Sequence, residues 1–153
     1  MDALLNCADC FVSLHRSEGF GLQIAEAMHL GKPVVVTNYS GNTDFTRPDN
    51  SLLVDYRMVP VGPGCAPYDP ASQWADPDVD QAACHLRTIA TNAELRAQLS
   101  QAGRTFIRET LCAEAVGRTM SKRLEQLRDI EVQRSKESKT APRQEPRTQS
   151  PVS

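Results

Sequence analysis

The stretch SEGFGLQIAEAMHLGKPVVV, residues 17–36, decides the fold because it contains three local signals in succession. It opens with a polar turn that contains two glycines. Apolar side chains then recur with helical spacing over residues 22–30, and Gly31 supplies a stop signal. Residues 33–37, PVVVT, are continuous in β-branched side chains, which is typical of a parallel strand covered on both faces. The stretch therefore predicts a turn, a helix and a buried strand in that order.

Further strands are expected on both sides of this stretch. Residues 10–14, CFVSL, predict a short buried strand after the last turns of a helix at 3–9, and residues 51–56, SLLVDY, predict a third strand. Strand, helix and strand with short connections are typical of a right-handed βαβ unit, so we expect an α/β domain with short parallel strands. A doubly wound sheet has about six strands, and this chain supplies about half. The strand at 10–14 is then an unprotected edge.

The rest of the chain is expected to be a loop, three helices and a tail. Residues 57–75 contain four prolines and two glycines without periodicity, which predicts a long loop near the site. A capping pattern at Asp78 marks the start of a helix, and two more helices are expected at 92–109 and at about 113–134. Residues 135–153 are rich in Ser, Pro, Lys and Gln with almost no apolar content, which predicts a disordered tail.

Composition narrows the classes of function. The chain has 153 residues and a net charge of −2. This charge argues against a protein that binds nucleic acids or membrane surfaces, because such proteins need a basic face. No apolar run approaches the roughly 20 residues of a membrane span, and the N-terminal residues lack the pattern of a signal peptide. Five cysteines at irregular spacing suit a reducing compartment better than a disulfide framework. We therefore expect a cytoplasmic protein, and its composition is compatible with binding of a small polar ligand.

The turn SEGFGL, residues 17–22, predicts an anion-binding site. It joins the carboxyl end of a strand to the N-terminus of a helix, where unpaired N–H groups and the helix dipole attract an anion. Gly19 and Gly21 let the backbone approach a ligand without a Cβ in the way. Glu18 stands just before the glycines, and Glu26 lies about 6 Å along the helix from its phosphate-binding end.

Three kinds of site fit this turn. A dinucleotide-binding fingerprint needs a third glycine where the chain has Ile24. Glu18 and Glu26 as the carboxylates of a glycoside hydrolase make little sense beside an anion site, because hydrolases act on neutral glycosides. In the third hypothesis, the helix N-terminus binds the diphosphate of a nucleotide-sugar, and each carboxylate accepts hydrogen bonds from neighbouring hydroxyls, one set on the sugar and one on the ribose. We favour the third.

The stretch EGFGLQIAEAMHLGKPVV, residues 18–35, closely resembles the E-x7-E motif of retaining glycosyltransferases of the GT-B fold, of the family 4 or group 1 type. The downstream segments TNYSGNTDF, NSLLVDY, VPVG and WADPDVDQAA resemble the continuation found in one bacterial branch of that family. The resemblance covers about residues 3–130. It implies that residues 1–134 form a Rossmann-like domain, the C-terminal half of a GT-B enzyme, which binds the nucleotide-sugar donor.

The resemblance also implies roles for individual residues. Glu18 would hold the hydroxyls of the transferred sugar as the catalytic residue, and Glu26 would bind the ribose hydroxyls. Backbone N–H groups of three consecutive residues would meet the sugar and the diphosphate: Phe20, Gly21 and Leu22. Gly19 is placed in the same donor site. Ser40, Gly41 and Asn42 follow the carboxyl end of a strand, where they either line the donor site or form a plain turn.

The family further implies transfer of the sugar with retention of anomeric configuration, with no cofactor and no metal ion. Front-side attack, in which the leaving phosphate oxygen draws the acceptor proton, is the route commonly proposed. Complete enzymes also have an N-terminal domain for the acceptor and an Arg and a Lys that clamp the diphosphate. We find neither here, and Lys32 is expected at the wrong end of the helix.

The expected partner is therefore a missing N-terminal GT-B domain, in cis or as a second chain, and we expect no transfer by this chain alone. The alternative is a non-catalytic remnant or an interaction module of the same fold. For three more side chains, the sequence leaves two roles possible, one in ligand binding and one in packing. His15 and Arg16 would contact phosphate or sugar, or serve the packing of the loop. Trp74, the only tryptophan, is more often a packing anchor than a platform for a sugar ring.

Overall fold

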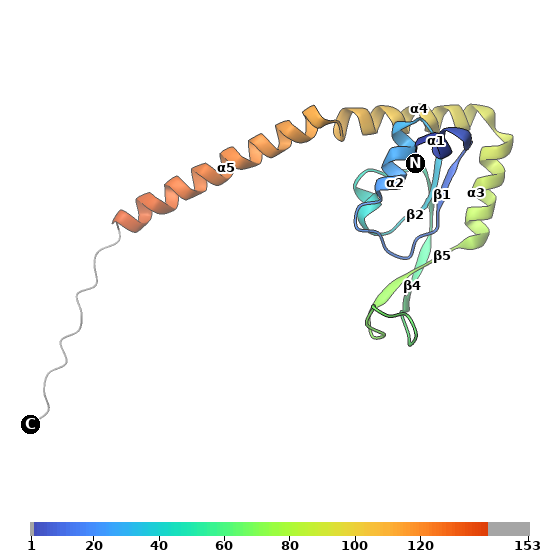
Figure 1. Ribbon diagram of the computed structural model, residues 1–153, viewed down its shortest axis with the longest axis horizontal. Coiled ribbons are helices and arrows are strands. Elements are labelled where there is room, and N and C mark those ends of the chain that lie inside the picture. The colour runs from blue at the N-terminus through green and yellow to red at the C-terminus, as the bar shows by residue number, and fades with distance from the viewer. Residues whose placement is uncertain (1, 141–153) are drawn as a thin grey trace, which may run out of the picture. The chain divides into compact units, whose positions relative to one another are not determined.

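The computed structural model describes residues 2–140, which form two compact units (Figure 1). The first unit spans Met1–Cys112 and the second spans Ala113–Ser153. The first unit contains all the strands of the described chain and four of its α-helices. Their bounds are α1 Asp2–Cys7, β1 Phe11–Ser13, α2 Leu22–His29, β2 Val34–Thr37, the 3-10 helix η1 Ser40–Asp44, β3 Leu52–Val54, β4 Tyr56–Pro60, β5 Gln73–Pro77, α3 Val79–Thr91 and α4 Ala93–Thr110.

A parallel sheet of three strands forms the centre of the first unit, in the order β1-β2-β3. Val12 of β1 is opposite Val35 of β2, and Val36 is opposite Leu53 of β3. Helix α2 connects β1 to β2, as the strand-helix-strand pattern predicts. The α/β class with short parallel strands followed by helices is therefore confirmed.

The valine run of β2 is buried on both faces of the sheet, as predicted. Successive side chains of a strand point to opposite faces, so Val34 and Val36 join one apolar cluster and Val35 joins another. The first cluster includes Ile24 and Met28 of α2, and the second includes residues of α3 and α4. Figure 1 accordingly shows α2 and α3 on opposite sides of the strands. A central strand of this kind fixes both helices against the sheet.

Helix α2 ends where the sequence places its stop signal. Gly31 has a φ of 76°, and the Lys32 N–H donates to the Ala27 carbonyl at 2.9 Å, which closes the left-handed turn that terminates many helices. The Lys32 ammonium donates to the Asn6 carbonyl at 3.0 Å. Lys32 therefore lies at the C-terminal end of α2, opposite the predicted anion site.

The long loop predicted at 57–75 is wrong in part, because both of its ends are strands. Strands β4 and β5 pair antiparallel, with Met58 opposite Ala75 and Val59 opposite Trp74. The prolines and glycines of the segment lie mostly in the connection between them, and β4 is mostly exposed, so neither strand has the alternation of apolar side chains that marks a half-buried strand. Only the connection, 61–72, is a loop.

The second unit contains the helix α5, Ala113–Thr140. The sequence predicts a domain over residues 1–134 and a disordered tail at 135–153, and α5 extends through residues 135–140. The remainder of the predicted tail, 141–153, lies outside the described residues. No helix in the described part of the chain is long and apolar enough to cross a membrane.

The predicted strand edge is present at β1. Within residues 2–140, β1 pairs only with β2. Cys10 directly precedes it and is half-buried, and this burial, with a smaller contribution from the charge of Asp9, raises the pKa of the Cys10 thiol to about 11. Cys7 and Cys84, by contrast, are exposed.

We expect Cys10 to resist alkylation in the native protein. At pH 8 a thiol with a pKa of about 11 is only about 10⁻³ thiolate, and the side chain is half-buried, so iodoacetamide should label Cys10 at least about 10-fold more slowly than the exposed Cys7 and Cys84. Peptide mass spectrometry over time measures the three rates. We expect the three cysteines to react at equal rates in urea and Cys10 to react more slowly in buffer. Equal rates in buffer would contradict the burial of Cys10.

Candidate functional site

The loops that follow β1 and β2 meet at the carboxyl edge of the sheet. The first loop runs from residue 14 to residue 21 and carries the predicted motif, and the second begins at Asn38 and continues into η1. Parallel strands bring such loops together because their carboxyl ends share one edge. The Gly41 N–H donates to the Glu18 carbonyl at 3.1 Å, so the two loops are in direct contact.

The N-terminus of α2 is open to an anion. Gly21 is its N-cap, with φ 88° and ψ 49°, and it provides no side-chain cap. The first hydrogen bond of the helix runs from the Ala25 N–H to the Gly21 carbonyl, so the earlier N–H groups have no acceptor within the helix. The first turn also lacks an acidic side chain. These features create the local positive potential that binds phosphate groups.

Gly21 is also needed for packing. A Cβ at this position would lie 3.0 Å from Ile24 Cδ1 and 3.3 Å from Asn42 Cβ, and the left-handed φ would strain any other L-residue. Gly21 therefore fixes how the chain enters α2.

Ser40 holds the backbone of Glu18. Its hydroxyl accepts from the Glu18 N–H at 2.6 Å and donates to the Glu18 carbonyl at 2.9 Å. Ser40 is the only non-glycine residue of the described chain with a positive φ, 68°. Such a conformation costs free energy and persists only where the surroundings enforce it. The geometry makes Ser40 a positioning residue for Glu18.

Gly41 lets the two loops touch. A Cβ built on Gly41 would lie 2.2 Å from the Gly19 carbonyl oxygen and 2.8 Å from Phe20 Cα, which are backbone atoms that cannot move aside alone. A Cβ on Gly19 would meet no atom within 4 Å. The two glycines therefore differ: Gly41 is required by packing, whereas Gly19 faces open space.

His15 anchors the same loop from its other end. Its Nε2 lies 3.0 Å from the Tyr39 carbonyl and 2.9 Å from Asn42 Oδ1, which are both acceptors, so Nε2 carries the proton. Its Nδ1 then accepts from the Ser13 hydroxyl at 3.0 Å. All three contacts are internal, which favours loop packing over contact with a phosphate for His15.

Asn42 follows Gly41 in the predicted turn, but its buried structural role is not visible in the sequence. It is fully buried, and its amide nitrogen donates to the Thr37 carbonyl at 3.0 Å and to Thr46 Oγ1 at 3.1 Å. Together with the contact to His15, these bonds tie the end of β2 to both loops. Asn is common in turns. The importance of Asn42 follows only from its hydrogen bonds to residues that are distant in sequence.

Glu18 and Glu26 are the half-buried carboxylates of the described residues that have no partner. Both are half-buried, and neither side chain makes a hydrogen bond or ion pair with another described residue. Glu26 lies on α2 between residues that are buried, Ala25 and Ala27. Removing part of the hydration of a carboxylate without a partner is unfavourable, so both groups are ready to accept hydrogen bonds from a ligand.

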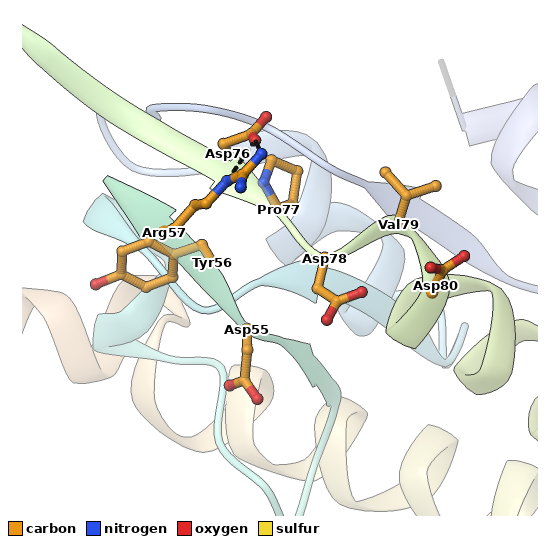
Figure 2. Close-up of a pocket in the computed structure, with 8 residues that line it drawn as sticks. All are labelled: Asp55, Tyr56, Arg57, Asp76, Pro77, Asp78, Val79 and Asp80. Carbon is orange, nitrogen blue, oxygen red and sulfur yellow. Dashed lines mark hydrogen bonds and ion pairs between the residues drawn. The ribbon is translucent and has the colours of Figure 1, made fainter. Parts of the chain in front are cut away.

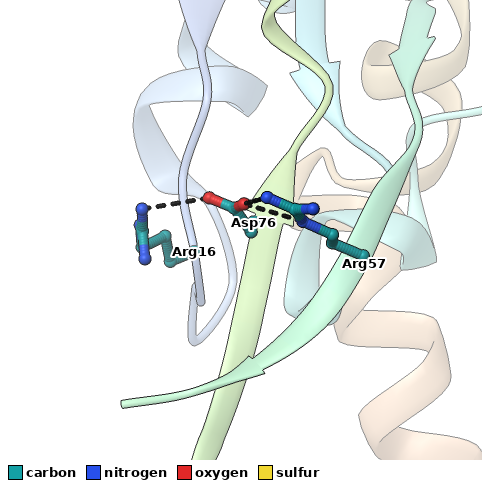
Figure 3. Close-up of polar contacts among 3 residues, drawn as sticks. All are labelled: Arg16, Arg57 and Asp76. Atoms are coloured by element: carbon teal, nitrogen blue, oxygen red, sulfur yellow. Dashed lines mark hydrogen bonds and ion pairs between the residues drawn. The ribbon is translucent and has the colours of Figure 1, made fainter. Parts of the chain in front are cut away.

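Arg16 leads from the motif loop to the β4–β5 hairpin (Figure 3). Its guanidinium pairs with Asp76 of β5 at 3.1 Å, and Arg57 of β4 pairs with the other oxygen of Asp76 at 3.0 Å. The Arg16 Cζ also lies 4.9 Å from the centre of the Trp74 ring, and the Arg16 carbonyl accepts from the Ala75 N–H at 3.0 Å. Arg16 is thus attached to the hairpin rather than left free for a phosphate, and Trp74 packs against it.

A hollow of about 550 Å³ in the first unit lies away from the predicted site (Figure 2). It lies where β4, β5 and α3 begin or end, and four of its lining residues are aspartates. The lining residues are Asp55, Tyr56, Arg57, Asp76, Pro77, Asp78, Val79 and Asp80. Three of these carboxylates have structural partners, since Asp55 and Asp78 bind Gln81 and Asp76 binds arginines. A wall of carboxylates repels a diphosphate.

Most of the predicted donor-site residues are brought together. They lie along one loop and the first turn of α2, or in the turn that supports this loop: Glu18, Gly19, Phe20, Gly21, Leu22, Ser40 and Gly41. Glu26 is farther along α2, one helical turn after Leu22. In residues 2–140, no group of three or more His, Cys, Asp or Glu side chains is arranged to hold a metal ion.

The α/β fold, with its parallel strands and C-terminal helices, is of the kind found in the C-terminal domains of GT-B glycosyltransferases. The sequence model of the family described as "Glycosyl transferases group 1" matches residues 1–57, which include β1, α2, β2 and the motif loop. No curated protein matches the chain.

Several solved structures are similar to this chain. HepE of Anabaena, in complex with UDP and glucose, aligns at a TM-score of 0.61 and 18% identity over 80% of this chain and 29% of its own. Sucrose-phosphate synthase of Thermosynechococcus elongatus aligns at 0.60 and 22% over 83% and 27%. The C-terminal domain of LpcC, a glycosyl transferase group 1 family protein of Francisella tularensis, aligns at 0.53 and 20% over 72% and 47%. The chain therefore spans less than half the length of each.

Replacing Gly41 should test the contact between the loops. We expect Gly41→Ala to lower the free energy of unfolding by about 1–3 kcal/mol, because the added Cβ overlaps backbone atoms of the motif loop. The matched change Gly19→Ala should stay within about 0.5 kcal/mol, since its Cβ meets nothing. Urea unfolding followed by circular dichroism measures both. Equal stabilities would show that the two loops do not touch as described.

Proposed function

We propose that this chain is the donor-binding part of a retaining glycosyltransferase, which transfers a sugar from a nucleotide-sugar to an acceptor. One observation carries the proposal: two half-buried carboxylates without partners, Glu18 and Glu26, flank a helix N-terminus that has no cap. The match of residues 1–57 to the group 1 family supports it, because these residues include the whole arrangement. HepE, a structure of similar fold, is recorded with UDP and glucose and with UDP-glucose.

The chemistry of a nucleotide-sugar suits each part of the site. The diphosphate carries the negative charge that the N-terminus of α2 attracts, and backbone N–H groups of Phe20, Gly21 and Leu22 would donate to its oxygens. Glu26 would accept from the two ribose hydroxyls, and Glu18 from the hydroxyls of the sugar. Each carboxylate has several lone pairs and can accept from two adjacent hydroxyls at once.

The role of the protein in the reaction would then be electrostatic. As the bond between the anomeric carbon and the phosphate oxygen breaks, negative charge grows on the leaving diphosphate. N–H groups that are already fixed at the start of α2 stabilise this charge without reorganising. Glu18 holds the sugar so that the acceptor hydroxyl attacks from the face of the leaving group, with its proton passing to a phosphate oxygen. Attack from that face retains the anomeric configuration.

Transfer would need a second domain. The carboxyl edge of the sheet provides one wall of a cleft, and an acceptor-binding N-terminal GT-B domain, in cis or on a partner chain, would provide the other. With one wall only, we expect this chain to bind a donor weakly, with a dissociation constant in the millimolar range.

Titration of the ¹⁵N-labelled chain with UDP-glucose tests the donor site. We expect the amide resonances of Phe20, Gly21 and Leu22 to shift with a common dissociation constant. Glu26→Gln should weaken binding about 10-fold or more, because a neutral amide loses the charge-assisted hydrogen bonds to the ribose. Glu94→Gln, at an exposed site on α4, is the matched control and should bind as the original chain does.

Three outcomes would count against the proposal. Shifts that fall outside the start of α2 would show that the nucleotide-sugar binds elsewhere. An unchanged affinity of the Glu26→Gln chain would remove the assigned role of Glu26, and a complete lack of shifts would favour a non-catalytic module of the same fold.

A further inference from the structure

A second, smaller hollow lies beside the motif loop. It measures about 200 Å³ and is formed by the two residues that precede Glu18 and by the β4–β5 hairpin. Its polar and aromatic lining residues are Arg16, Ser17, Tyr68, Ser72, Gln73 and Trp74. Pockets for drug-sized ligands measure about 300–1,000 Å³, so this hollow accommodates roughly one ring. Because neighbouring Cα atoms are about 3.8 Å apart, a ligand against Ser17 lies next to the backbone of Glu18.

Two aromatic rings form part of its wall. Tyr68 and Trp74 meet edge to face, with ring centres 6.0 Å apart and an angle of 63° between the planes. Tyr68 is 62% exposed although it is large and aromatic. The Arg16 guanidinium covers the Trp74 ring and Asp76 pairs with this guanidinium, so the Trp74 wall is held in place. Rigid rings offer apolar surface at a small cost in conformational entropy.

The remaining polar lining groups are neutral and unused. The side chains of Ser17, Ser72 and Gln73 make no hydrogen bond with any residue that the structure describes. Two hydroxyls and one amide can each donate and accept. The single charged lining group, that of Arg16, is already paired with Asp76. A ligand that fits this wall is neutral, rich in hydroxyls and apolar on one face, which describes a pyranose ring.

We propose that this hollow is a carbohydrate-binding subsite that takes one neutral hexose unit of the acceptor. The subsite is distinct from the donor site at the start of α2, because none of its lining residues is a predicted donor-site residue. Its role as an acceptor site rests on the proposed function, whereas sugar binding itself does not. The hairpin thus contributes acceptor recognition to a domain whose other site binds the donor.

The single tryptophan of the chain makes the subsite directly observable. Trp74 is the only one in the sequence, so its fluorescence reports on the hollow alone. We expect a saturable change when the full chain is titrated with the methyl glycosides of glucose, galactose and mannose, with a dissociation constant of about 1–50 mM for at least one of them. No saturable change up to about 200 mM with any of the three would overturn the proposal.

Variants show whether the response comes from the subsite. We expect each of two single variants, Tyr68→Ala and Gln73→Ala, to weaken sugar binding at least 10-fold. The first removes an exposed ring and the second an amide without a hydrogen-bond partner. Both chains should therefore keep the circular dichroism spectrum of the original. Tyr56→Ala, an exposed tyrosine of the same hairpin outside the hollow, is the matched control and should leave binding unchanged. Equal loss in all three variants, or in none, would refute the assignment.

The outcome can be separated from that of the donor site. Glu26→Gln should leave the sugar titration unchanged while it weakens the shifts caused by UDP-glucose. A Trp74 response without UDP-glucose binding would leave the carbohydrate subsite standing and remove its role as an acceptor site. UDP-glucose binding without a Trp74 response would leave the donor site standing and remove the carbohydrate subsite.

Discussion

The contact between two backbones at the carboxyl edge of the sheet is the constraint on which the site depends. The motif loop and the turn after β2 come so close that a Cβ on Gly41 would overlap backbone atoms of Gly19 and Phe20. The Ser40 hydroxyl then satisfies both the donor and the acceptor of the Glu18 peptide unit. Buried backbone groups need such partners, and here the partner comes from a segment 22 residues away in sequence. The position of Glu18 is therefore a property of two loops together.

The sheet makes this contact possible. Because β2 is buried on both faces between helices, its direction and register are fixed, and the turn after it can emerge at only one place. Asn42 links this turn to the motif loop, because its side chain is hydrogen-bonded both to the Thr37 carbonyl at the end of β2 and to His15. The β4–β5 hairpin approaches the same loop from another direction, at Arg16. A loop held at three points is preorganised, so a ligand that binds it loses little free energy in ordering it.

Local patterns predict the βαβ unit and the capped helices. The valine run, the helical spacing after Gly21, the stop at Gly31 and the cap at Asp78 all depend on neighbours within a few residues, and each is confirmed. The β4–β5 hairpin was missed because its strands lack an alternating apolar pattern. It is stabilised by backbone pairing and by contacts that join residues far apart in sequence.

The sequence likewise predicts the part of the candidate site that depends on local motifs, and does not predict the part that depends on contacts between distant residues. The glycines and glutamates of the motif loop are visible in the sequence, and the resemblance to a family names their roles, which remain proposals. The role of Ser40 could not be read, because a serine with a φ of 68° has no sequence signature of the kind that glycine provides. The same holds for Asn42, whose partners lie on β1, β2 and η1 or just beyond them.

The one-sided pairing of β1 has a consequence for the behaviour of the chain in solution. Val12, at the middle of this strand, is 40% exposed, and among residues 2–140 no other strand covers the outer edge. A bare edge of a parallel sheet is a template onto which further strands can add. Whether copies of this chain associate through their sheets at high concentration therefore depends on whether another polypeptide segment occupies the edge beside β1.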